Sequence, residues 1–233
     1  MRDPAELARM SSPEFSQNSR NSAGGVSADS VRHPAGKQNA PSCTEFPFWL
    51  VLISGPPRAG KSRAGTCLSD KLDADHFALS NLLKQMTHDH FDLGKDCLPL
   101  AFESCKDKPL PEFGGLTPRD AYIMYSETIL KPRHGSGCLG QEGKKRVKSN
   151  LSRGRISVVS GVGFIDEVRP LINAVGGEYA LHIRITGQRA MHLEDSREYL
   201  DLAAFGLTEV ETENRSCRQF LESLRQLLPC FRI

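Results

Sequence analysis

The sequence predicts an α/β fold, a three-layer α/β/α arrangement around a mostly parallel sheet. Short, continuously apolar runs have the length and composition of strands that are buried on both faces. Stretches of helical length separate these runs, as the connections between parallel strands require. With 233 residues, of which 39% are apolar and 25% charged, the chain can form one such domain and still carry additional sequence.

Residues 1–45 differ from the rest of the chain because they are rich in Ser, Asn, Gly and Pro. Their few large apolar residues show no sustained period, so the segment cannot bury enough surface to offset its ordering entropy. We expect a disordered leader or a cloning-derived segment here, because residues 12–15 resemble linker sequence. The folded domain is therefore expected to span residues 46–233.

The first elements of this domain are predicted from apolar runs and capping residues. Residues 46–54 form a continuous apolar run that ends in Gly-Pro-Pro, which is typical of a buried strand. A helix is expected over residues 61–72 and a short strand over 76–79. Ser80 is the expected N-cap of a helix over residues 81–91.

An irregular excursion is predicted for residues 93–116, because prolines and glycines gather near its end. Thr117-Pro118 then has the pattern of a helix start, with proline in the first turn. This helix is expected to run to about Leu130 and to be stopped by Pro132.

The second half of the domain alternates helices and strands once more. The expected elements are a basic helix over residues 139–153, a buried strand over 156–160, a helix over 165–174 that stops at Gly176-Gly177, a strand over 179–185 and a last helix over 215–228. Strands separated by helices in this order predict a mostly parallel sheet.

Composition assigns no macromolecular partner. Thirty basic and 28 acidic residues leave a formal charge of +2, without the surplus that electrostatic binding of nucleic acid normally needs. The longest apolar run is far shorter than the roughly 20 residues of a membrane span. We therefore expect no membrane or nucleic acid partner, whereas a homodimer is compatible with the sequence.

The cysteines and the N-terminus indicate a reducing compartment. Seven cysteines are an odd number, and they include neither a Cys-x-x-Cys pair nor a cluster with histidine at zinc-finger spacing. Free thiols are therefore expected rather than disulfides or a metal site. The first residues lack the apolar region of a secretory signal peptide, which predicts a cytoplasmic location.

One motif carries clear chemistry. Gly55-Pro56-Pro57-Arg58-Ala59-Gly60-Lys61-Ser62 fits the phosphate-binding loop (P-loop) pattern G-x-x-x-x-G-K-[ST], and it lies between a predicted strand and a predicted helix. Glycines let the backbone wrap closely around phosphate oxygens, and the helix N-terminus adds the positive end of its dipole. Lys61 would bridge the β- and γ-phosphates of a nucleotide, and the Ser62 hydroxyl would ligate Mg²⁺.

A kinase also needs cations that neutralise the moving phosphoryl group and hold an acceptor in line. Candidates follow predicted strands or the excursion, where ligands of open α/β sheets gather. They are Arg119, Arg133, Arg189 and Arg197.

Four stretches carry a resemblance to a known family. They are residues 53–62, residues 77–84, Thr117-Pro118-Arg119-Asp120 with Ser126-Glu127 and Lys131-Pro132, and Val158-Val159-Ser160 with Phe164 and Glu167. In this order they resemble the P-loop deoxynucleoside monophosphate kinases of tailed phages and prophages. The resemblance covers about residues 48–205.

The resemblance implies an adenylate-kinase-like fold, ATP with Mg²⁺, and a (deoxy)nucleoside monophosphate as acceptor. It also implies an acceptor-side insertion at about residues 93–138 and a lid-like segment at about 187–205 that closes over the phosphates. The implied nucleotide-binding residues are Gly55, Pro56, Pro57, Arg58, Ala59, Gly60, Lys61, Ser62 and Arg63. The implied acceptor-side residues are Lys84, Arg119, Glu127 and Arg133, and the implied catalytic residues are Lys61, Arg119, Arg133 and Arg197.

One departure from the family leaves alternatives open. Where the better-known phage kinases carry an Asp-x-Arg element, this chain has Gly161-Val162-Gly163, so the acid that would hold Mg²⁺ through water is missing. Asp166 or Glu167 could substitute for it. A nucleotide-binding protein with little turnover is therefore a second hypothesis. A third is a P-loop kinase of another small molecule or a polynucleotide end, which the basic residues 144–155 would favour.

Overall fold

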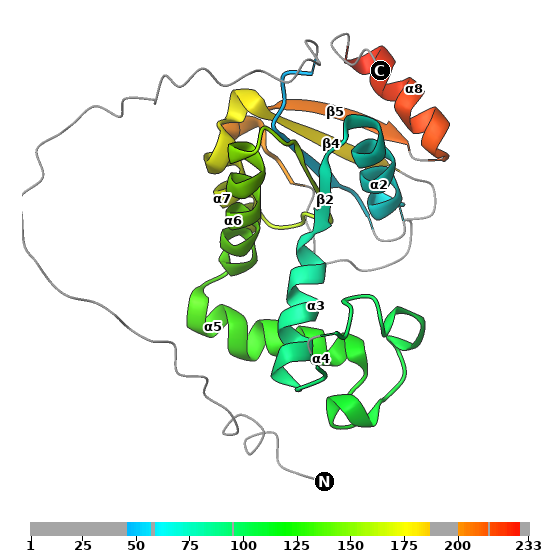
Figure 1. The fold of residues 1–233 in the computed structure, drawn as a ribbon, viewed down its shortest axis with the longest axis vertical. Helices are drawn as coiled ribbons and strands as arrows, with labels where there is room; N and C mark the ends of the chain where they lie inside the picture. The colour runs from blue at the N-terminus through cyan, green and yellow to red at the C-terminus, as the bar shows by residue number, and fades with distance from the viewer. Residues whose placement is uncertain (1–45, 57–58, 95, 187–199, 214, 229–233) are drawn as a thin grey trace, which may run out of the picture. The chain divides into compact units, whose positions relative to one another are not determined.

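A five-stranded parallel sheet forms the centre of the domain (Figure 1). The computed structural model describes residues 46–56, 59–94, 96–186, 200–213 and 215–228. The sheet order is β2-β3-β1-β4-β5. The strands are β1 (Leu50–Ser54), β2 (Asp75–Ala78), β3 (Ser157–Ser160), β4 (Ala180–Thr186) and β5 (Thr208–Glu213).

The helices cover both faces of this sheet, so the predicted three-layer α/β/α fold is confirmed. The α-helices of the described residues are α2 (Lys61–Leu72), α3 (Leu79–His90), α4 (Pro118–Met124), α5 (Lys131–His134), α6 (Cys138–Ser152), α7 (Ile165–Val175) and α8 (Cys217–Leu227). Helices α2 and α8 pack on one face, and α6 and α7 pack on the other (Figure 1).

Strand β1 lies in the middle of the sheet and is buried on both faces, as its apolar sequence predicts. Val51 and Ile53 pack against the α2 and α8 side, where Leu68 and Phe220 also lie. Leu50 and Leu52 face the α6 and α7 side instead. Because β1 is central and the loop that follows it leads into α2, the motif at residues 55–62 lies at the carboxyl edge of the sheet.

Two predicted helix boundaries are wrong. Ser80 is not an N-cap, because α3 begins at Leu79 and Ala78 takes the N-cap position. Pro132 does not stop the preceding helix either: α4 continues through a π-helical segment, η3 (Tyr125–Leu130), into α5. Proline is tolerated there because it lies in the first turn of α5, where a backbone N–H is not needed.

Strand β5 was not predicted from the sequence. Its residues Thr-Glu-Val-Glu-Thr-Glu alternate β-branched residues with glutamates, a period-2 pattern that a search for continuous apolar runs misses, and Thr212 is the residue of this strand that is buried. The strand pairs in parallel with β4 and forms an edge of the sheet. Charged side chains on an edge strand discourage pairing with another chain. The glutamates of β5 fit this position at the edge, and they also explain why the strand lacks the apolar pattern of a buried strand.

The expectation that all cysteines are free thiols is wrong for one pair. Cys67 of α2 and Cys217 of α8 form a disulfide across 150 residues of sequence. Their pairing depends on the packing of α8 beside α2 in one layer, which residue spacing does not reveal. Cys97, Cys105 and Cys138 are free in the described part of the chain.

Apart from residue 95, which lies outside the described residues, the predicted excursion lacks strands and α-helices and contains two short 3-10 turns, η1 (Glu103–Cys105) and η2 (Pro111–Phe113). Aromatic rings hold it together. Phe113 is fully buried, and its ring packs against those of His88, Phe102 and Tyr122. The excursion is thereby attached to α3 and α4.

The basic α6 helix is partly tied into the fold. Arg146 donates two hydrogen bonds of 2.6 Å to the Asp75 carboxylate of β2, and Asn150 donates a third of 2.8 Å. Arg146 therefore serves the packing of α6 on β2. No helix within the described residues is both long and apolar enough to span a membrane.

Candidate functional site

The P-loop connects β1 to α2, as the motif predicts. Gly55 has φ 146°, and a Cβ at this position would overlap the carbonyl oxygen of Ile185 on β4. Gly60 has φ 82° and caps the N-terminus of α2. Both positions therefore require glycine, Gly55 for close approach to the neighbouring strand and Gly60 for its left-handed backbone. Pro57 and Arg58 lie outside the described residues.

The Lys61 side chain folds back over the loop. Its ammonium group donates hydrogen bonds of 2.7 Å to the Gly55 carbonyl and 2.6 Å to the Pro56 carbonyl. Because Lys61 is the first residue of α2, its charge lies beside the N-terminal end of the helix dipole. An anion bound in the loop would meet the ammonium group and the helix N-terminus together.

A cavity of about 500 Å³ adjoins the P-loop. Its walls come from α2, the start of α3, the excursion, the α4 region, and the segment between β3 and α7. Its lining side chains are Lys61, Ser62, Ala78, Leu79, Ser80, Leu83, Lys84, Glu103, Lys106, Arg119, Tyr122, Ile123, Ser126, Glu127, Lys131, Leu139, Ser160, Gly161, Gly163, Phe164 and Glu167.

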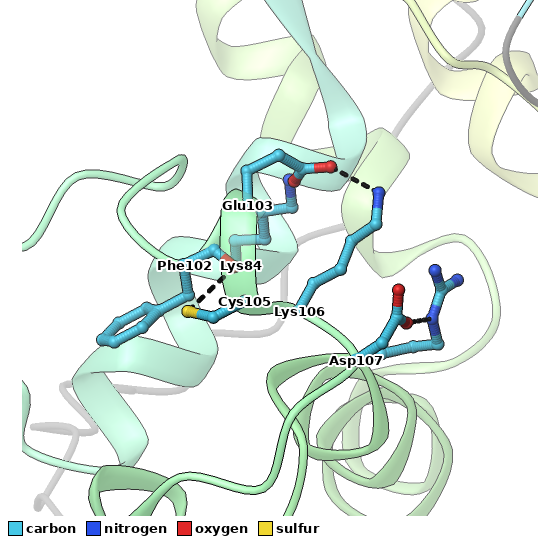
Figure 2. A network of polar contacts seen from close by, with 7 residues as sticks. Lys84, Phe102, Glu103, Cys105, Lys106 and Asp107 are labelled. Atoms are coloured by element: carbon cyan, nitrogen blue, oxygen red, sulfur yellow. Dashed lines mark hydrogen bonds and ion pairs between the residues drawn. The ribbon is translucent and has the colours of Figure 1, made fainter.

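Charged pairs line the side of the cavity formed by α3 and the excursion (Figure 2). Lys84 donates a hydrogen bond of 2.9 Å to Oε2 of Glu103, and Lys106 donates one of 2.7 Å to Oε1 of the same carboxylate. Arg119 Nε donates to Asp107 at 2.7 Å. The hydrogen bonds from Lys106 and Lys84 lower the pKa of Glu103, so this carboxyl is ionised at neutral pH.

A further ion pair lies along the helix that carries η3 and α5. Lys131 donates a hydrogen bond of 2.6 Å to Glu127, one helical turn earlier. The Lys131 ammonium also lies 5.4 Å from the centre of the Phe164 ring, within cation–π range. The cavity wall therefore combines cations with an aromatic face.

Tyr122 contributes a neutral aromatic surface to the cavity. Burial raises its pKa to about 12, so the phenol keeps its proton at physiological pH. Its hydroxyl is hydrogen-bonded to Nε2 of the buried His88 at 3.0 Å. Burial also lowers the pKa of His88, which favours the neutral imidazole in this pair. His88 therefore holds the orientation of the Tyr122 ring.

The two acids that the sequence left as alternatives, Asp166 and Glu167, lie in different surroundings at the start of α7. Asp166 is exposed, and its carboxylate accepts a hydrogen bond of 2.5 Å from Ser136. Glu167 is only 7% exposed and lines the cavity. Helix α6 lies so close that a Cβ on Gly140 would overlap the Glu167 backbone. Of the two acids, the geometry favours Glu167 as the one that faces the site.

Strand β3 ends in the hydroxyl of Ser160, directly before Gly161-Val162-Gly163. Ser160 lines the cavity, and its hydroxyl is hydrogen-bonded to Nε2 of His76 at 2.9 Å. The next residue, Gly161, has φ 75° and donates its backbone N–H to the Ile53 carbonyl at 3.0 Å. The end of β3 is thereby held against the end of β1, directly before the P-loop.

Several predicted site residues line this cavity, and others do not. Lys61, Ser62, Lys84, Arg119 and Glu127 are among the lining residues. Arg63 and Arg133 are exposed and are not among them. Arg189 and Arg197 lie outside the described residues, as do residues 187–199 of the expected lid.

The sequence assigned no role to Glu103, Lys106 or Lys131. Glu103 and Lys106 belong to an irregular excursion without a motif, so their approach to Lys84 could not be deduced from spacing. Only Lys131 had a usable signal, because it follows Glu127 by four residues on a predicted helix.

The oxygen donors of the cavity suit Mg²⁺ when nucleotide phosphates complete its coordination. Ser62, Ser160 and Glu167 bring two hydroxyls and one carboxylate to the same space. Within the described residues, no group of three or more histidine, cysteine, aspartate or glutamate side chains could hold a metal by itself. The donor set therefore fits a metal that arrives with a nucleotide.

Comparison with known proteins assigns no family. The sequence matches no family model, and none of the curated proteins matches it. Among solved structures it is similar to the crystal structure of a gluconokinase from Sinorhizobium meliloti 1021, with 13% sequence identity and a TM-score of 0.39. The similarity covers 79% of this chain and 95% of that chain. A TM-score this low supports no conclusion about substrate or mechanism.

Proposed function

We propose that this protein transfers a phosphoryl group from ATP to a (deoxy)nucleoside monophosphate. One observation carries the proposal: a single cavity is lined by Lys61 and Ser62 of the P-loop and by the cations Lys84, Arg119 and Lys131. A donor phosphate on the loop and an anionic acceptor among the cations would therefore share one space. Phosphoryl transfer requires this proximity above all.

The loop supplies what a nucleoside triphosphate needs on the donor side. Its backbone and the N-terminus of α2 favour anionic phosphates, and Lys61 adds a full positive charge. Lys61 would exchange its hydrogen bonds to the loop carbonyls for the charged oxygens of the β- and γ-phosphates. Bound Mg²⁺ would be held by the Ser62 hydroxyl and the phosphates, with Glu167 of the same cavity as the candidate to bind it through water, and would neutralise charge on the transferred group.

The acceptor side combines cations with apolar and aromatic walls. Leu83, Tyr122, Ile123, Leu139 and Phe164 line the cavity beside the charged residues. Such walls suit a planar base, while Lys84 and Arg119 suit a phosphate. The volume of about 500 Å³ is typical of sites for small molecules, and it is too small for a folded macromolecule.

The proposed reaction is a direct in-line transfer without a covalent intermediate. Its transition state needs positioning and charge stabilisation more than a strong base, so a site rich in lysine and arginine fits it. The acceptor phosphate oxygen attacks the γ-phosphorus, and the bond from that phosphorus to the bridging oxygen of ADP breaks. The products are ADP and a nucleoside diphosphate.

The test is ADP formation from Mg-ATP with each (deoxy)nucleoside monophosphate in turn. We expect turnover with one or two of them, and Lys61→Ala should abolish it. Lys145→Ala is the matched control, because Lys145 is an exposed lysine of α6 outside the cavity and should leave the rate unchanged. A full panel without ADP above the Lys61→Ala background would refute the proposal.

A nucleotide-binding role with little turnover is the second candidate. The observation that favours it is the segment after β3, where Gly161 and Gly163 line the cavity and supply no acid. This candidate predicts that ATP binds with Lys61-dependent affinity while no monophosphate stimulates ADP formation. The same two measurements, ATP binding and ADP formation, therefore separate the two functions.

A further inference from the structure

Glu103 lies between two of the lysines that face the cavity. Each of its carboxylate oxygens accepts a hydrogen bond from a different lysine, Oε2 from Lys84 and Oε1 from Lys106 (Figure 2). Lys84 comes from α3, whereas Glu103 and Lys106 come from the η1 turn and the residue after it. All three side chains line the cavity that also contains Lys61.

The pairing is buried on one side and open to solvent on the other. The Lys84 side chain is only 16% exposed, whereas those of Glu103 and Lys106 are 47% and 39% exposed, so the carboxylate is accessible to an incoming ligand. The Cys105 thiol donates to the Phe102 carbonyl at 3.6 Å, and the Phe102 ring packs on the buried Phe113. These contacts anchor the backbone around Glu103 to the aromatic cluster, so the backbone that carries the carboxylate has a defined position beside the two lysines.

The charges of this group indicate what can replace the carboxylate. Glu103 brings one negative charge to two positive ones, so the group keeps a net charge of +1. An incoming monocarboxylate offers the same charge and the same two oxygens, and it competes with a partner already attached to the chain at high effective concentration. A phosphate monoester carries about −1.5 to −2 charges and three acceptor oxygens at pH 7, so it outcompetes a carboxylate.

We propose that Glu103 is an internal anion that occupies Lys84 and Lys106 and that every anionic ligand of these lysines must displace. The inference rests on the proposed function, because it places the acceptor's phosphate at these two lysines. The displacement lowers the affinity of all anionic ligands by the same factor, so a dianionic phosphoryl group, which binds the two lysines most strongly, still binds where a monocarboxylate does not.

Binding measurements without ATP test the proposal. The probes are adenosine and thymidine 5′-monophosphates as phosphate monoesters, and D-gluconate as a polyol with a single carboxylate. Calorimetric titration of the full chain should show at least one monophosphate binding about tenfold or more tightly than gluconate. In Glu103→Gln the affinities of the monophosphate and of gluconate should both rise by about tenfold, because neither ligand then has to displace an internal anion.

Glu142→Gln is the matched control. Glu142 also accepts hydrogen bonds from a lysine with both oxygens, but it lies on α6 and does not line the cavity. The variant removes the same charge, and we expect it to leave both affinities unchanged. Circular dichroism of both variants establishes that they are folded.

Three results would overturn the inference. They are unchanged affinities in folded Glu103→Gln, gluconate binding as tight as monophosphate binding in the wild type, and the absence of binding of every probe. The proposed function fails separately. Higher affinities in Glu103→Gln without ADP formation refute phosphoryl transfer and keep the role of Glu103, whereas ADP formation with unchanged affinities does the reverse.

Discussion

Replacement of Gly65 by alanine probes the contact between the P-loop helix and the end of β3. Gly65 lies on the buried face of α2, and a Cβ there would overlap the imidazole ring of His76 on β2. The same ring is hydrogen-bonded to the Ser160 hydroxyl at 2.9 Å. Gly65→Ala must therefore displace either α2 or the His76 ring, and both movements reach the candidate site.

The expected magnitude combines three contributions. Forcing a methyl group into a packed interface costs about 1–3 kcal/mol. Loss of the His76–Ser160 hydrogen bond adds about 1 kcal/mol. Alanine recovers about 0.8–1 kcal/mol through its higher helix propensity. We therefore expect Gly65→Ala to lower the free energy of unfolding by about 1–3 kcal/mol.

A double-mutant cycle measured by urea denaturation isolates this contact. His76→Ala removes the ring, so the added methyl group then has space. In that background we expect Gly65→Ala to be neutral or to stabilise the protein, because only its helix propensity remains. A loss of the same size in both backgrounds would show that the collision with His76 is not the cause.

Two further predictions concern stability. Asp75→Asn should lower the free energy of unfolding at pH 7 by about 2 kcal/mol, because the carboxylate accepts charged hydrogen bonds from Arg146. Those bonds lower the pKa of the Asp75 carboxyl below its usual value. The stabilisation that the ionised carboxylate provides is therefore complete above the usual pKa, and it is lost as the pH falls through the lower pKa of the folded state. Urea denaturation should therefore show a smaller difference in the free energy of unfolding between the wild type and Asp75→Asn at pH 3 than at pH 7. Asp73→Asn, at a fully exposed carboxylate, should have little effect at either pH. Reduction of the Cys67–Cys217 disulfide, which closes a loop of 150 residues, should cost about 3–5 kcal/mol and lower Tm. An equal Tm with and without reductant would contradict that expectation.

Local patterns were sufficient for most of the fold. The apolar runs of β1 and β3 and the helices between them follow from residue type and spacing, because parallel strands are buried on both faces. The turn from β1 to α2 follows from the glycine spacing of the P-loop. The missed strand β5 shows the limit of these patterns, because an edge strand is stabilised by pairing with β4 and not by an apolar sequence.

Helix boundaries and cysteine pairing depended on neighbours in space. Ser80 has a good capping side chain, yet α3 starts earlier because β2 leads directly into it. The π-helical segment before Lys131 lets the chain continue past Pro132. Cys67 and Cys217 are joined because two helices 150 residues apart share one face of the sheet.

The sequence by itself determined a P-loop between a buried strand and a helix, because eight consecutive residues encode that geometry locally. Tertiary structure decided what faces the loop. It brings Lys84 of α3 and Glu103 of the excursion together, and it turns Glu167 rather than Asp166 toward the cavity. The physical reason is that these contacts join segments of unrelated pattern, whose approach depends on packing of the aromatic cluster and of α6 on α7.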